Sequence, residues 1–75
     1  MKNEPPEPDP KIEFTGHQLT IIQLWSEEQS AAAVAKVLDL SEHTVLTHLK
    51  RMRRKLRVRR TFEVYKYARD KNLIK

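Results

Sequence analysis

The 75-residue sequence contains no cysteine and a single glycine, and its four prolines all lie within the first ten residues. The lack of cysteine excludes disulfides and thiolate-ligated metal centres. One glycine cannot build the glycine-rich loop with which many enzymes bind nucleotide phosphates. No apolar run approaches the roughly 20 residues of a membrane-spanning helix, and no hydrophobic segment near the N-terminus is typical of a signal peptide. We therefore expect a small cytoplasmic domain that is not an enzyme, holds no cofactor and is not bound to a membrane.

Positive charge is concentrated in one short segment. The chain has a formal net charge of +5, but residues 1–13 hold four acids and two lysines, so residues 14–75 carry +7. Eight basic residues and no acid lie between positions 50 and 60: Lys50, Arg51, Arg53, Arg54, Lys55, Arg57, Arg59 and Arg60. So dense a cluster on a small domain indicates a polyanionic partner. A solvated helix face is the alternative interpretation.

Prolines and helix-capping residues divide the chain into a tail and four predicted helices. The prolines predict that residues 1–13 are a flexible, acidic tail or linker, which leaves residues 14–75 as the folded domain. No segment alternates with a period of two, so we expect an all-α fold. Thr15, Ser30, Ser41 and Thr61 are the predicted N-caps, with Gln18 completing a capping box. The helices are expected from Thr15 to about residues 27–29, and over residues 31–38, 42–57 and 62–72.

The ends of these helices can also be predicted. Asp39 and Asn72 tolerate the left-handed backbone conformation in which helices often end. After Asn72, we expect Leu73 and Ile74 to fold back onto the core.

The third predicted helix has one buried side. At 100° per residue, four apolar positions fall within an arc of about 60°, namely Val45, Leu49, Met52 and Leu56. We expect this seam to pack against Ile21, Ile22, Trp25, Val34 and Leu38. Trp25 is therefore interpreted as a core residue rather than a platform for base stacking.

The opposite side of the same helix is polar and cationic. It carries His43, Leu46, Thr47, Lys50, Arg51, Arg54 and Arg57. A short helix and a three-residue turn precede it, which together describe a helix-turn-helix. In such motifs the second helix enters the major groove of DNA and reads base edges. Leu46 is either an exposed apolar residue or a contact for a thymine methyl group.

The ordered motif residues resemble a known family. Ser41, Thr44 and Val45 are followed at fixed spacing by His48-Leu49, Lys55-Leu56 and Val58. This pattern, together with Phe14-Thr15, Ser30 and Val34-Ala35 before it, resembles the LuxR/GerE-type DNA-binding domain of bacterial transcription regulators over residues 14–74. The resemblance implies a four-helix domain that stands alone or forms the output domain of a longer protein such as a response regulator.

The resemblance also implies roles for individual residues. Leu46, Thr47 and Lys50 match positions that read bases, and the outward face adds His43. Phosphate-contacting positions are matched by Ser30, Ser41, Thr44, His48, Arg54 and Lys55, and the outward face adds Arg51 and Arg57. Thr44 could instead pack its methyl group in the turn. Ala31–Ala33 replace the family's common Asn-Lys-Glu, and Thr61 replaces a frequent arginine, so we infer an unusual or relaxed site preference, with the additional arginines of residues 51–60 compensating.

The fourth predicted helix suggests that a second copy of the chain is also a partner. It has more apolar surface than one small core can bury, so Phe62, Tyr65 and Tyr67 are predicted dimer contacts, with Arg69 at the rim. The expected partners are thus double-stranded DNA, a second copy bound weakly on DNA, and RNA polymerase. A helical protein-interaction module that binds acidic segments is the alternative function. His43 and His48 do not converge on the helix, so no metal site is predicted.

Overall fold

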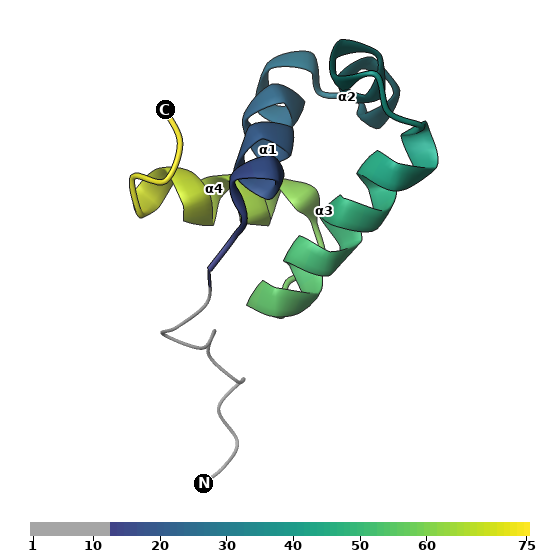
Figure 1. Cartoon of the computed structure of the whole chain (residues 1–75). Coiled ribbons are helices and arrows are strands. Elements are labelled where there is room, and N and C mark those ends of the chain that lie inside the picture. The colour runs from purple at the N-terminus through teal and green to yellow at the C-terminus, as the bar shows by residue number, and fades with distance from the viewer. Residues whose placement is uncertain (1–12) are drawn as a thin grey trace, which may run out of the picture.

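The computed structural model describes residues 13–75, which form four helices and no strand (Figure 1). The helices are α1 (Gly16–Glu28), α2 (Ala31–Leu38), α3 (Glu42–Leu56) and α4 (Thr61–Asp70). α1 packs against each of the other three, and α3 also packs against α2 and α4. The predicted all-α fold is confirmed. The predicted tail lies outside the described residues, except for Glu13.

Side-chain caps begin the first three helices as the sequence predicts. The Thr15 hydroxyl accepts a hydrogen bond from the Gln18 backbone N–H at 3.0 Å, and the Gln18 side-chain oxygen accepts one from the Thr15 N–H at 3.2 Å. Ser30 caps α2 and Ser41 caps α3 in the same way. Each cap supplies an acceptor to an N–H group that has no partner within its helix.

The start of α4 corrects the prediction. Arg60 is its N-cap, without a side-chain hydrogen bond, and Thr61 is the first helical residue. The Thr61 hydroxyl instead accepts a hydrogen bond from Nη1 of Arg53 at 2.9 Å. The prediction of Thr61 as a cap was therefore wrong, because the extended backbone of the N-cap position falls at Arg60 and Thr61 is already helical. The predicted bounds of α4, residues 62–72, were also shifted.

Left-handed residues other than glycine end α1, α2 and α3. Gln29, Asp39 and Arg57 are the C-caps of α1, α2 and α3, each with φ of 58°. Asp39 therefore behaves as predicted, whereas Arg57 ends α3 one residue before the predicted boundary. Asn72 also has a positive φ, of 60°, and the following residue, Leu73, donates its N–H to the Ala68 carbonyl at 2.8 Å.

The core lies where the four helices meet. It contains the predicted seam of α3 together with residues of the other helices, and its buried members are Ile21, Ile22, Val34, Ala35, Val45, Leu49, Met52, Leu56, Val64 and Ala68. Trp25 and Leu38 are half-buried at its edge. Ile74 folds back onto the core as predicted, but Leu73 is 42% exposed, so the prediction was wrong for this residue.

Candidate nucleic-acid interface

A tight turn sets the angle between α2 and α3. Asp39 and Leu40 donate their N–H groups to carbonyls of the last turn of α2, at Lys36 and Ala35. Leu40 is half-buried against the core, which anchors the turn. After the turn, the Ser41 hydroxyl lies 2.8 Å from the Thr44 hydroxyl at the start of α3. Helix, turn and helix thus follow the helix-turn-helix arrangement with α3 as the second helix.

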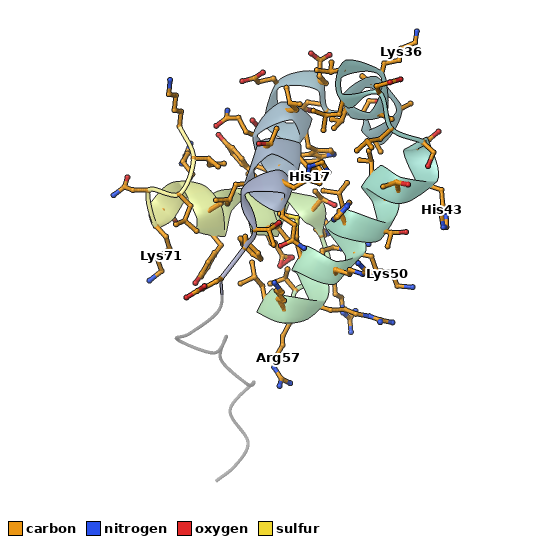
Figure 2. All side chains as sticks on the ribbon, viewed as in Figure 1. His17, Lys36, His43, Lys50, Arg57 and Lys71 are labelled. Carbon is orange, nitrogen blue, oxygen red and sulfur yellow. The ribbon has the colours of Figure 1, made fainter. Side chains whose placement is uncertain are left out.

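The outward face of α3 presents polar and cationic groups. Figure 2 shows His43, Lys50 and Arg57 at successive levels along this helix, pointing away from the rest of the domain. All three are exposed, as is Arg54, and Leu46 is 48% exposed. Thr47 is half-buried and donates its hydroxyl hydrogen to the His43 carbonyl at 2.9 Å. The oxygen of Thr47 thus retains acceptor capacity toward a ligand.

The comparison with protein families agrees with this geometry. Residues 13–68 match the luxR family of bacterial regulatory proteins, GerE. The chain belongs to the luxR family. Searches of curated proteins and of solved structures gave no significant match. Membership of the family identifies the domain as a helix-turn-helix DNA-binding domain of a bacterial regulator.

Six of the eight candidate phosphate contacts of this luxR-family domain fall into two groups. Arg51, Arg54 and Arg57 are exposed arginines of the outward face. Ser30 and Ser41 use their hydroxyl oxygens as caps of α2 and α3, and Thr44 is half-buried beside Ser41. The serine and threonine hydroxyls thus lie at helix N-termini, where N–H groups and the helix dipole favour an anion.

Two members of the basic cluster also bind within the domain, which sequence reasoning missed. Nζ of Lys55 donates to the Glu13 carbonyl at 2.8 Å and lies 5.6 Å from the centre of the Phe14 ring. Arg53 donates to Thr61, as described above. Lys55 therefore holds the segment before α1, and Arg53 ties α3 to α4. No pattern along the chain signals these contacts, because each joins residues that only the fold brings together.

His48 does not lie on the open outward face. It is half-buried at the contact between α1 and α3, and its ring is 5.0 Å from that of His17, edge to face. Its Nδ1 atom is buried without a hydrogen-bond partner among residues 13–75. Burial, followed by the neighbouring His17 and Arg51, lowers the pKa of His48 below its ordinary value. The neutral ring with its proton on Nε2 fits this site, because a proton on Nδ1 would have no acceptor.

The sequence did not predict this histidine pair, because helical periodicity relates His48 only to residues of its own helix, such as His43. Within the described part of the chain, no group of three or more potential ligands could hold a metal ion. The edge-to-face geometry also directs one ring at the other rather than both nitrogens at one point. We therefore interpret the pair as a packing contact between α1 and α3.

The predicted dimer residues of α4 lie on two different sides. Phe62 is 57% exposed, and the centre of its ring lies 6.0 Å from the centre of the Tyr65 ring. The guanidinium group of Arg69 lies over the other aromatic ring, that of Tyr65. Tyr67 instead packs edge to face against Phe14, at 6.3 Å. Tyr65 and Tyr67 are both half-buried against the core. Phe62, Tyr65 and Arg69 thus form one continuous side, from which Tyr67 is separate.

The described residues include no helix long and apolar enough to cross a membrane.

Proposed function

We propose that this domain binds double-stranded DNA sequence-specifically, with α3 in the major groove, as part of a bacterial transcription regulator. The observation that carries the proposal is the division of α3 into a buried apolar seam and an outward face that holds hydrogen-bonding and cationic groups without an acid. The major groove is about 12 Å wide and admits one helix. A negatively charged duplex complements this face in both shape and charge.

The first half of α3 is proposed to read bases. Lys50 can donate to the acceptors of guanine, and Thr47 can bond to either a donor or an acceptor. Leu46 is exposed and can contact a thymine methyl group, while His43 lies one turn earlier on the same face. The phosphate contacts are proposed to come from Ser30, Ser41, Thr44, His48, Arg51, Arg54, Lys55 and Arg57. For His48, the neutral Nε2–H group is the proposed donor.

The cellular setting follows from the family. A transcription regulator acts on the nucleoid, so we propose a cytoplasmic location for the chain, either alone or as the output domain of a longer regulator. A weak dimer on adjacent half-sites is proposed to use Phe62, Tyr65 and Arg69 of α4, with Tyr67 as the less favourable member because it packs against Phe14. RNA polymerase is the proposed protein partner at a promoter.

Selection of duplexes from a random library, followed by affinity measurements, tests the base-reading role. Lys50→Ala should weaken binding to the selected site by about 1–3 kcal/mol and relax the preference at one position. The exposed Arg54→Ala is the matched control, because loss of a phosphate contact weakens all sequences equally. If Lys50→Ala lowered affinity without altering preference, its base-reading role would be wrong. A wild-type domain that bound acidic peptides but no duplex would favour the protein-interaction alternative.

A further inference from the structure

α3 is longer than the groove that it is proposed to enter. Its 15 residues span about 22 Å at 1.5 Å per residue, whereas the major groove is about 12 Å wide. The candidate base-reading residues occupy positions 43–50, in the first part of the helix. With that part in the groove, the C-terminal end of α3 emerges from it on the side of a phosphate backbone. Figure 2 shows Arg57 at this end, pointing away from the domain.

The connection between α3 and α4, residues 57–60, is held at both ends. The Val58 N–H donates to the Arg53 carbonyl at 3.0 Å, and the half-buried Val58 side chain packs against the core. At the other end, the Glu63 N–H donates to the Arg60 carbonyl at 3.1 Å. One inward residue therefore fixes a segment whose other three side chains, Arg57, Arg59 and Arg60, are exposed.

Helix stabilisation does not account for all of these arginines. Cations stabilise the negative end of a helix dipole within its last turn, where α3 already has Arg53, Arg54 and Lys55. Arg59 and Arg60 lie beyond the C-cap of α3, and Arg60 precedes the positive end of α4, where a cation is unfavourable. Arg53 and Lys55 have partners within the domain. Arg59 and Arg60 thus add charge where the fold gains little from it.

We propose that Arg59 and Arg60 bind phosphates of the DNA that flanks the half-site, outside the groove read by α3. The inference rests on the proposed DNA-binding function and adds a second, sequence-independent contact zone to it. Because α3 emerges from the groove in one direction, the contacted phosphates lie on one flank of the half-site only. Each neutralised phosphate releases bound counterions, so each contact contributes about −0.9 to the slope of log affinity against log salt.

Salt titrations of the 75-residue chain on its selected half-site test the proposal. The duplex carries flanks of equal length on both sides, and it is compared with duplexes trimmed at one flank or the other. The Arg59→Ala/Arg60→Ala double variant should reduce the slope on the full duplex by about 1.8. For the wild type, trimming one flank should reduce the slope by the same amount and trimming the other should leave it unchanged. The double variant should be insensitive to both trims.

Two control variants separate phosphate contact from other effects. Lys71→Ala/Lys75→Ala removes the same net charge beyond the C-terminal end of α4, and Figure 2 shows Lys71 far from the outward face of α3. This pair should change the slope by less than half as much. Arg59→Lys/Arg60→Lys keeps the charge and should restore the wild-type slope. Thermal melting should show that all variants stay folded, with only small shifts in Tm, since none of the four residues is buried.

The outcomes are distinct for the function and for the inference. A wild type that binds no duplex overturns the proposed function, and the flanking contact with it. A wild type that binds its site while the arginine variant keeps the full slope overturns the flanking contact alone. An equal loss of slope in the Lys71/Lys75 control also overturns it, since net charge would then explain the result.

Discussion

Two leucines of α3 allow the buried seam to be tested separately from the DNA-binding face. Leu49 is 3% exposed within the core, whereas Leu46, three residues earlier on the same helix, is 48% exposed. Truncation of a buried leucine to alanine costs about 2–5 kcal/mol, through lost burial and the cavity left behind. Leu49 belongs to the same buried cluster as Val45 and Met52, so its truncation leaves a cavity within the core. We expect a loss of about 3 kcal/mol for Leu49→Ala.

The corresponding change in Tm is large for a domain of this size. A loss of 1 kcal/mol lowers the Tm of a 60–100-residue domain by about 4–8 °C, so Leu49→Ala should melt roughly 12–24 °C below the wild type. Leu46→Ala removes the same atoms from a partly exposed side chain outside the core cluster and should change stability by less than about 0.5 kcal/mol. For the affinity of the folded domain for DNA, the order should reverse: Leu46→Ala should have the larger effect, because it removes a proposed base contact. Equal Tm values for the two variants would refute the assignment of the seam.

Three further predictions concern contacts between helices. Because the pKa of His48 is lowered on folding, the unfolded chain binds more protons at acidic pH. Stability should therefore be full above about pH 6.5 and fall at more acidic pH; urea titrations should show a weaker pH dependence for His48→Gln than for the wild type. Thr61→Val removes the acceptor of Arg53 and should cost about 1 kcal/mol by thermal melting, whereas Thr20→Val, which loses an exposed bond within α1, should cost less than half as much. Tyr65→Ala should abolish cooperative binding to a duplex with two half-sites while single-site affinity is kept; independent filling of both half-sites by the wild type would contradict the α4 dimer.

Local chemistry explains why the first three helices could be predicted. Thr15, Ser30 and Ser41 each bond to an N–H three residues later, so the signal and the structure lie in the same short segment. At Thr61 the same reasoning failed. Its hydroxyl is engaged by Arg53, which lies eight residues earlier and on another helix. Thr61 lies inside the helix rather than at its N-cap, so its hydroxyl serves the contact between α3 and α4 instead of the helix start.

In the candidate site, too, some features follow from the sequence of one helix and others depend on packing between segments. The 3.6-residue period of an α-helix gives the outward direction of His43, Leu46, Lys50 and Arg54 once the seam is known, and these residues are exposed as predicted. His48 lies between seam and outer face, and periodicity does not show that it faces His17 of α1. Lys55 belongs to the basic cluster in the sequence, but its bond to the Glu13 carbonyl spans 42 positions of the chain.

The sequence by itself determined the all-α fold, the caps of α1 to α3, the buried seam and the concentration of positive charge, because these properties depend on residue type and on spacing within one helix. The tertiary structure decided which members of the basic cluster also have partners within the domain. Arg53 and Lys55 have partners on other segments, while Arg57, Arg59 and Arg60 are exposed on either side of the inward Val58. The physical reason is that a charged side chain bonds to whichever partner the packing of the helices places within its reach. The distance between such partners on different segments is not encoded in the periodicity of one helix.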